Sequence, residues 1–405
     1  MLEGFWVRNF KSLKQVGIGT CFPKFVYIED ESKVFPYKLS PVTVFTGANG
    51  TGKSSLTDAI NFISDCYRYG VDAAVLKRGG YDAVYSQGSS GVISFGFHFH
   101  QPGETEPVTY AVSIDCSKNK VPYIETEILT YQRGKESVPV FFLQNGVKSI
   151  RYLAPDDKLS NAELTKIEFT DYNHLGLAAL ESHPKYPVVE SLRSFFENWA
   201  LCHFTPDPAR GLGNTLPHRQ ESPRGVSLSE VVRYIIQRYK NNLRVLLSRV
   251  AEAIPNVDRI LIDDANPSKP YVSFQMLDRD TPVSITHLSA GVVRLFTYFL
   301  LLQEDEPAPL VVFEEPENGL DRAFRARMLE ELNLFEHRDA RTQVFVNSHH
   351  PAIMNAVNPR QVWVLEKDRD GFTAVERASD SFFLSDEDNS NPNPNWFSTY
   401  FDEKR

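Results

Sequence analysis

Residues 47–54 have types and a spacing that suit the binding of a phosphate group. They read Gly-Ala-Asn-Gly-Thr-Gly-Lys-Ser and fit the pattern G-x-x-x-x-G-K-[ST]. Small residues let backbone N–H groups surround a phosphate, Lys53 can reach the β and γ oxygens, and the Ser54 hydroxyl can bind Mg²⁺. An apolar run over 42–45 precedes this segment and a helical pattern over 55–63 follows, which is the strand–loop–helix context that the motif requires. The residues expected to contact the nucleotide here are Gly47, Ala48, Asn49, Gly50, Thr51, Gly52, Lys53, Ser54 and Ser55.

A pair of carboxylates follows a second buried-strand pattern. Residues 310–313 are Leu-Val-Val-Phe, and Glu314 and Glu315 come directly after them. At such a strand end one carboxylate can hold Mg²⁺, directly or through water, while its neighbour polarises an attacking water. We assign Glu314 to the metal shell and Glu315 to water activation. A pair of surface glutamates that caps the next segment is the alternative, and the phosphate-loop motif makes it less favourable.

Two further segments carry candidate ligand-binding groups. Ser289 and Gly291 stand at the start of an apolar helix pattern, where a hydroxyl and free N–H groups can bind an anion; an ordinary N-cap is the plainer interpretation. A buried-strand pattern over 343–347 is followed by Ser348 and His349. A histidine at the end of such a strand faces the ligand crevice of an α/β sheet, so His349 can contact the γ-phosphate or the attacking water, whereas a purely structural histidine is the alternative.

Composition indicates an ordinary globular protein of about two or three domains, or one large domain with insertions. The chain has 405 residues, of which 42% are hydrophobic and 23% charged. No apolar run has membrane-spanning length, the N-terminus lacks the basic start of a signal peptide, and the four cysteines stand far apart. We therefore expect a cytoplasmic protein with reduced thiols and no membrane partner. The net charge of −9 argues against a basic surface over the whole molecule, but it is compatible with a local stripe that binds DNA.

Three stretches of the chain differ in the secondary structure or composition that the sequence indicates. Strand patterns recur between 92 and 152 and predict an antiparallel meander, while residues 175–254 have a mainly helical pattern interrupted by a loop over 205–225. From Asp380 the tail is acidic, and its aromatic residues Trp396, Phe397, Tyr400 and Phe401 are expected to dock on the body or on a partner. The domain organisation expected is 1–170, 171–280 (mostly helical), 281–378 and 379–405.

Taken in order, these segments resemble the ATP-binding-cassette (ABC) ATPases of the RecF, SMC and OLD type. The resemblance covers residues 1–65 and 285–365. It rests on Asn-Phe-Lys-Ser at 9–12, the phosphate loop, Leu288 to Arg294, and Ser348 to Pro351. Residues 314–320, Glu-Glu-Pro-Glu-Asn-Gly-Leu, are similar to the E-E-P-E-N-G-[IL] form of compact bacterial members.

This resemblance implies an α/β fold, namely a P-loop NTPase with an ABC-type ATPase head, an antiparallel β meander and a helical insertion. It also implies that Ser289 and Gly291 form the signature that contacts ATP on another protomer, that 318–321, ending in Asp321, form the D-loop, and that His349 is the switch histidine. The chain departs from the family in having Glu314 where many members have Asp, a shortened signature, and Asp-Arg at 321–322 in place of His-Pro. Gln87 is a weak match to the Q-loop glutamine.

The implied activity is ATP hydrolysis by two protomers that meet head to tail around two ATP molecules and Mg²⁺. Lys53 and Mg²⁺ would neutralise phosphate charge, and Glu315 would orient water. Only 56 residues follow His349, too few for the nuclease domain that OLD proteins carry there.

Three functions remain open. They are an ATPase sensor that controls a separately encoded effector such as a nuclease or toxin in phage defence, a RecF-like ATPase that binds DNA in repair, and a scaffold that binds ATP without turnover. The acidic balance and the lack of a long coiled coil favour the first over the second. The N-terminal strand, the meander and the short signature argue against a transporter subunit.

Overall fold

The computed structural model describes residues 1–20, 37–100, 107–133, 136–144, 147–151, 164–168, 172–179, 187–203, 243–263, 271–303, 308–336, 342–381, 395–398 and 400. The chain forms two compact units. The first comprises Met1–Ser40, Phe45–Glu197 and Trp363–Asp380, and the second comprises Pro41–Val44, Asn198–Val362 and Ser381–Arg405. Both units combine helices and strands, in agreement with the α/β class expected from the sequence.

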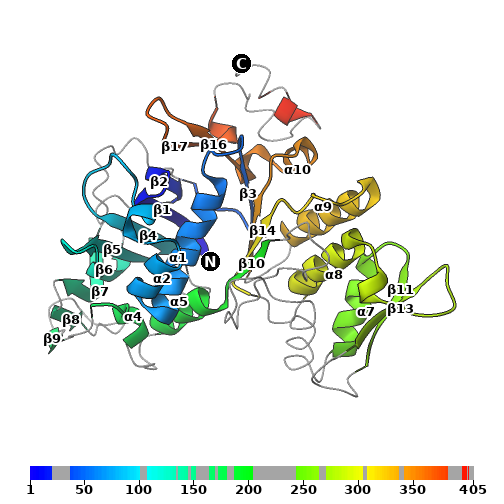
Figure 1. Cartoon of the computed structure of the whole chain (residues 1–405), viewed down its shortest axis with the longest axis horizontal. Coiled ribbons are helices and arrows are strands. Elements are labelled where there is room, and N and C mark those ends of the chain that lie inside the picture. The colour runs from blue at the N-terminus through cyan, green and yellow to red at the C-terminus, as the bar shows by residue number, and fades with distance from the viewer. Residues whose placement is uncertain are drawn as a thin grey trace. The chain divides into compact units, whose positions relative to one another are not determined.

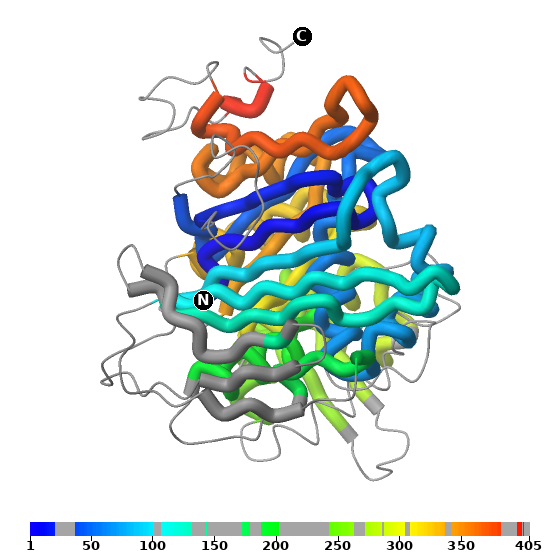
Figure 2. Tube along the Cα trace, turned by 90° about the vertical axis from the view of Figure 1, so that its left-hand side faces the viewer, coloured from blue at the N-terminus to red at the C-terminus, as the bar shows by residue number. Residues whose placement is uncertain are grey.

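An eight-stranded antiparallel sheet forms the base of the first unit, with the strand order β2-β1-β4-β5-β6-β7-β8-β9. Figure 2 shows β2, β1, β4, β5 and β6 of this sheet side by side. The strands expected between residues 92 and 152 are therefore confirmed. The bounds are β1 Leu2–Phe10, β2 Leu13–Gly19, β4 Ile93–Phe99, β5 Val108–Cys116, β6 Pro122–Arg133, β7 Glu136–Gln144, β8 Val147–Arg151 and β9 Leu164–Glu168.

Helices cover one face of this sheet (Figure 1). Alternation along β4 places Phe95, Phe97 and Phe99 on the same face of the strand. The Phe95 ring lies 5.5 Å from the Phe62 ring of α1, and the Phe97 ring lies 5.3 Å from that of Phe196 in α5. The helices of this unit are α1 Lys53–Tyr69, α2 Val71–Leu76, α3 Tyr81–Val84, α4 Gly176–Ala179 and α5 Pro187–Asn198.

Strand β3 (Val42–Thr46) leads into the phosphate loop. All five of its residues are buried, as expected for an apolar strand covered on both faces. In the first unit β3 neighbours β16 (Val362–Lys367), which pairs with β17 (Thr373–Arg377) in an antiparallel hairpin.

In the second unit the strand order is β10-β14-β15-β3. Strands β10 (Ala200–His203), β14 (Leu310–Glu314) and β15 (Gln343–Asn347) run parallel to one another. Parallel strands end at the same edge of a sheet, so the residues that follow β14 and β15 are placed close together. This register determines which of the candidate catalytic residues described below lie opposite each other.

The helices of the second unit are α7 (Leu243–Ala253), α8 (Ala290–Gln303), α9 (Arg322–Glu336) and α10 (Pro351–Asn355). Figure 1 shows α8 packed between α7 and α9. A small antiparallel sheet of β11 (Val257–Asp263), β12 (Tyr271–Met276) and β13 (Val283–Ser284) adjoins α7. Segment 171–280, expected to be mostly helical, thus also contains strands β10, β11 and β12. Short 3₁₀ turns occur at Ile285–His287, Pro359–Gln361 and Ala378–Asp380.

The aromatic residues of the acidic tail dock within the second unit. Trp396, Phe397 and Tyr400 are buried, the Trp396 indole N–H donates to the Val357 carbonyl at 3.2 Å, and the Phe397 amide donates to Asn355 Oδ1 at 3.0 Å. Docking on the body is therefore confirmed for these three residues, and Phe401 lies outside the described residues, as do 205–225. The four-segment division of the chain remains a prediction. None of the helices in the described part of the chain is both long enough and apolar enough to cross a membrane.

A buried histidine in the first unit predicts a stability that depends on pH. His98 on β4 is 3% exposed, and burial lowers its pKa from 6.5 to about 4, although the charge of Glu3 acts in the opposite direction. Because the unfolded chain takes up this proton first, the stabilisation should be lost as the pH falls from about 6.5 towards 4. Lowering the pH from 7 to 4.5 should therefore reduce the unfolding free energy of the wild type by about 2–3 kcal/mol more than that of the His98→Gln variant. Urea unfolding at both pH values measures this, with the exposed His287→Gln as the control. Equal pH dependence in wild type and His98→Gln would contradict it.

Candidate functional site

The phosphate loop joins β3 to α1 in the first unit. Gly47 (φ 148°) and Gly52 (φ 112°) lie in the region that favours glycine. A Cβ atom would lie 2.1 Å from the Leu365 carbonyl oxygen at Gly47 and 2.3 Å from Thr373 Oγ1 at Gly52. These two glycines of the motif are therefore required both by the backbone and by their surroundings.

Lys53 is the first residue of α1, and its side chain folds back over the loop. Its Nζ atom donates to the Gly47 carbonyl at 2.7 Å and to the Ala48 carbonyl at 3.2 Å. The side chain is buried, so the ammonium group is held at the loop and not in bulk water. Ser54 is exposed and Ser55 is partly exposed at the start of the same helix.

Two side chains distant in sequence brace this loop. Thr373 Oγ1 donates to the Thr51 carbonyl at 2.7 Å and lies 2.9 Å from Ser12 Oγ, while the Thr373 amide donates to the Ser12 carbonyl at 2.9 Å. Ser12 belongs to the Asn-Phe-Lys-Ser segment that the sequence analysis singled out. Thr373 was missed, because a lone threonine at the start of a strand gives no signal in the sequence.

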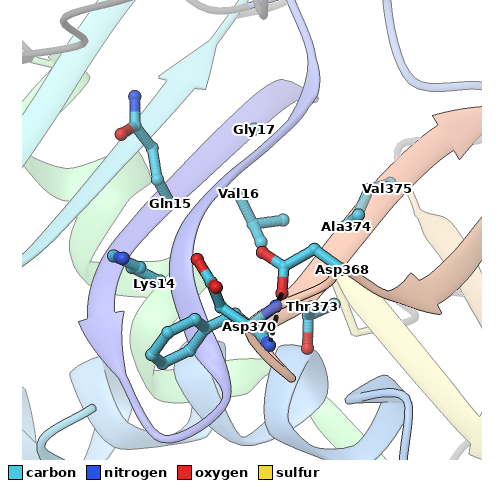
Figure 3. Close-up of a pocket in the computed structure, with 10 residues that line it drawn as sticks. Lys14, Gln15, Val16, Gly17, Asp368, Asp370, Thr373, Ala374 and Val375 are labelled. Atoms are coloured by element: carbon cyan, nitrogen blue, oxygen red, sulfur yellow. Dashed lines mark hydrogen bonds between the residues drawn. The ribbon is translucent and has the colours of Figure 1, made fainter. Parts of the chain in front are cut away.

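A groove of about 390 Å³ lies between β2 and the β16–β17 hairpin and shares Thr373 with the loop (Figure 3). Lys14 lines one side, and its Nζ atom is 4.7 Å from the centre of the Phe372 ring. On the other side Asp368 Oδ1 accepts hydrogen bonds from the Asp370 and Phe372 amides, which fixes the hairpin turn. A groove that adjoins a phosphate loop and offers an aromatic ring and a cation can accommodate the rest of a nucleotide.

Ion pairs anchor the phosphate-loop helix α1. Asp58 lies 2.6 Å from Lys11 Nζ and 2.7 Å from Arg78, and Arg78 also lies 2.8 Å from Asp65. Burial opposes the charge on Asp58, but Arg78 and Lys11 outweigh it and lower the pKa of this carboxyl group. The ion pairs thus hold the helix at two positions beyond its first turn, Asp58 and Asp65.

In the second unit the two carboxylates lie at the end of β14, where the sequence predicts them. Glu314 ends the strand, and Glu315 has a φ of 47°, which is unusual for a residue with a side chain. The Glu315 amide donates to the Asn347 carbonyl at 2.8 Å, and the Asn347 side-chain amide lies 3.5 Å from Glu314 Oε1. The ends of β14 and β15 therefore hold Glu315 in a strained conformation, which is common at functional sites.

His349 and Glu315 are brought together. His349 Nδ1 lies 2.6 Å from Glu315 Oε2, and their side chains are 54% and 27% exposed. Next to them, the buried Glu317 carboxylate accepts a hydrogen bond of 2.5 Å from Ser348 Oγ. Burial raises the pKa of Glu317, although Ser348 partly offsets this. Glu317 was within the sequence motif but was not recognised as a candidate residue.

The predicted signature residues lie beside the predicted D-loop. A Cβ atom at Gly291 would lie 3.0 Å from the Phe324 ring and 3.3 Å from the Gly319 carbonyl oxygen, so the absence of a side chain allows this approach. Ser289 Oγ accepts from the Val292 amide at 3.4 Å, and Asp321 Oδ1 accepts from the Phe324 amide at 2.8 Å. Both residues therefore make the contacts of helix N-caps, and both are exposed.

Residues 42–355 match a protein family described as "AAA domain, putative AbiEii toxin, Type IV TA system". The chain belongs to this AAA-domain family. No curated protein matches the chain. The solved SMC head domain from Thermotoga maritima is similar with a TM-score of 0.44 and 16% identity, over 93% of this chain and 98% of that one. An SMC head bound to the C-terminal winged-helix domain of ScpA is similar with a TM-score of 0.54 and 14% identity, over 93% and 97%. The second likeness confirms the predicted P-loop fold with an ABC-type head.

The sequence analysis also did not identify His350, a second histidine of the AAA domain. His350 Nε2 lies 2.7 Å from Arg325 of α9, and its Nδ1 accepts from the Ala352 amide at 3.1 Å, which caps α10. Burial, followed by Arg325 and His349, lowers the pKa of His350. The His350 side chain thus links the start of α9 to the start of α10, immediately beside His349.

The structure brings some of the candidate residues of the AAA domain into contact with their expected partners. It joins Lys53 to its loop, Glu315 to His349, and Gly291 to the segment after Gly319. Gln87 is exposed, and its side-chain amide donates to the Asp82 carbonyl at 2.8 Å, so its role as the Q-loop residue remains a prediction. The same holds for the individual roles of the other candidate residues.

Proposed function

We propose that this chain binds ATP at the phosphate loop and hydrolyses it. The pair formed by Glu315 and His349, 2.6 Å apart after two parallel strands, is the observation that carries the proposal. A carboxylate held in this way can orient a water molecule and accept its proton, while the imidazole contacts the γ-phosphate. Lys53 would neutralise charge on the β and γ phosphates.

Magnesium would be held by Ser54 and Glu314. Both offer oxygen, the donor atom that this ion requires, and the Ser54 side chain is exposed. Once bound, the ion supplies positive charge that stabilises the phosphate oxygens during transfer.

Two copies of the chain would meet head to tail, so that Ser289, Gly291 and Asp321 of one copy reach ATP on the other. The exposure of Ser289 and Asp321 supports this arrangement, since each keeps an accessible side chain while it caps a helix. Binding of ATP would close the pair and hydrolysis would reopen it, because only the triphosphate makes the contacts that favour the closed state.

The output of this cycle would be control of a separately encoded effector, a nuclease or a toxin, in cytoplasmic phage defence. The family description supports the toxin part of this proposal, because it names a toxin and a toxin–antitoxin system. Expression of the chain together with the genes that flank its own would test it. Protection from phage that is lost in the Glu315→Gln variant supports the proposal, and equal protection by both contradicts it.

Phosphate release by the wild type and by Glu315→Gln tests the ATPase proposal. Loss of a general base lowers turnover by about 10²–10⁴-fold, so we expect at least a 100-fold loss in the variant. Mass measurements should show ATP-dependent dimers that accumulate in the variant, since it binds ATP without reopening. The matched control is Glu330→Gln on α9, whose side chain is 60% exposed. Turnover by Glu315→Gln at the wild-type rate, or a wild type that neither hydrolyses ATP nor changes mass with it, would contradict the proposal.

A further inference from the structure

Three potential metal ligands converge after β14 and β15 in the second unit. Glu315, Glu317 and His349 each offer one ligand atom, and these atoms lie within 4.8 Å of one another. The backbone bond from Glu315 to Asn347 and the side-chain bond from Ser348 to Glu317 hold the two segments together. The three groups are therefore positioned by the parallel strands and do not depend on a flexible loop.

The Glu317 side chain provides a second, independent observation. The residue is 3% exposed, and its Oε2 atom has no hydrogen-bond partner within the described part of the chain. A buried carboxylate oxygen without a partner is costly, and a bound cation would satisfy it. Glu315 Oε2 likewise makes no hydrogen bond there, although it lies 2.6 Å from His349 Nδ1.

We propose that Glu315, Glu317 and His349 form a binding site for a divalent transition-metal ion, with Zn²⁺ as the best fit. One imidazole nitrogen and two carboxylates are a donor set that Zn²⁺ accepts with a water as fourth ligand. Mg²⁺ prefers oxygen donors alone, so the histidine selects against it. None of these three ligands is among the residues proposed for Mg²⁺, which are Ser54 and Glu314.

Occupancy by Zn²⁺ would inhibit the ATPase, an effect that rests on the proposed function. The ion would occupy Glu315, the proposed base, and His349, the proposed γ-phosphate contact. Neither group could then act on water or on the nucleotide. The cluster would thus make turnover sensitive to free zinc.

Calorimetric titration with Zn²⁺ alone, without nucleotide and in excess Mg²⁺, tests the site directly. We expect one ion per chain in the wild type and at least a tenfold weaker affinity in Glu317→Gln and in His349→Ala. Because Glu317 is buried, the half-exposed His349 provides a variant that does not disturb packing. The exposed Glu330→Gln should bind as the wild type does. Absence of one-to-one binding in the wild type, or unchanged affinity in both variants, would overturn the proposal.

Phosphate release at buffered free Zn²⁺ separates this inference from the ATPase proposal. At ten times the measured Kd we expect at least a fivefold loss of wild-type turnover that a chelator reverses. If the wild type binds zinc but never hydrolyses ATP, the metal-site proposal is supported and the ATPase proposal is contradicted. Hydrolysis without zinc binding would overturn the metal site and leave the ATPase standing.

Discussion

The Lys53→Met variant should lose ATP hydrolysis by about 10²–10³-fold, the loss that follows removal of one charged or donor group aimed at a transition state. Lys53 Nζ already lies at the phosphate loop, at 2.7 Å from the Gly47 carbonyl and 3.2 Å from that of Ala48. A triphosphate in this loop would place negative oxygens within reach of the same ammonium group. Methionine keeps the length and the apolar stem of the side chain but offers no charge and no donor.

Phosphate release and binding of a fluorescent ATP analogue measure the effect, and thermal unfolding shows whether the loop remains folded. Lys120→Met is the matched control, because Lys120 is exposed and pairs with the exposed Asp82. It should keep the activity of the wild type. Full hydrolysis by Lys53→Met would mean that the loop does not bind the phosphates in the way proposed.

The phosphate loop could be predicted from the sequence because every feature of it is local. Glycines at fixed intervals, a lysine at the helix start and an apolar strand before it all lie within about a dozen residues. The hydrogen bond that Thr373 donates to the loop at Thr51 could not be predicted, because 322 positions separate these two residues. A single threonine has no periodicity, and only the fold brings the β16–β17 hairpin to the loop.

The carboxylate and histidine segments were recognised as strand ends, but their register was not. Pairing of Glu314 with Asn347 places Glu315 and Glu317 beside Ser348 and His349. A sequence shows that two strands are buried, and it does not show which residues lie opposite each other. The strands β11 and β12 within the expected helical segment were missed for a similar reason. Their stability comes from pairing with each other and not from a strong local pattern.

Glu127 is the position where we expect the largest loss of stability. It lies on β6 and is fully buried, and its Oε1 atom accepts hydrogen bonds from the Tyr110 hydroxyl at 2.7 Å and from the Leu177 amide at 2.8 Å. Its Oε2 atom accepts from the Gly176 amide at 2.5 Å. These amides begin α4, so one carboxylate joins two strands of the large sheet to the start of a helix. Burial, and to a smaller extent the charge of Glu127, raises the pKa of the Tyr110 hydroxyl, so this hydroxyl keeps its proton and donates it in the hydrogen bond.

The Glu127→Ala variant should therefore lose about 3–5 kcal/mol of unfolding free energy, because three buried donors remain without an acceptor. Tyr110→Phe removes one donor and keeps the carboxylate paired with α4, so its loss should be about 1–3 kcal/mol. Urea unfolding at pH 7 measures both, with Glu190→Ala as the control, since that side chain is 62% exposed and should cost under about 0.5 kcal/mol.

The Glu127→Gln variant separates charge from shape at this position. Glutamine keeps the volume and one acceptor, but its NH₂ group would face a donor, either the Gly176 amide or the pair formed by Tyr110 and Leu177. Its loss should fall between those of Tyr110→Phe and Glu127→Ala. A loss for Glu127→Ala no larger than that of the exposed control would mean that α4 is held by apolar packing alone. In that case the buried carboxylate contributes nothing to the stability of the first unit.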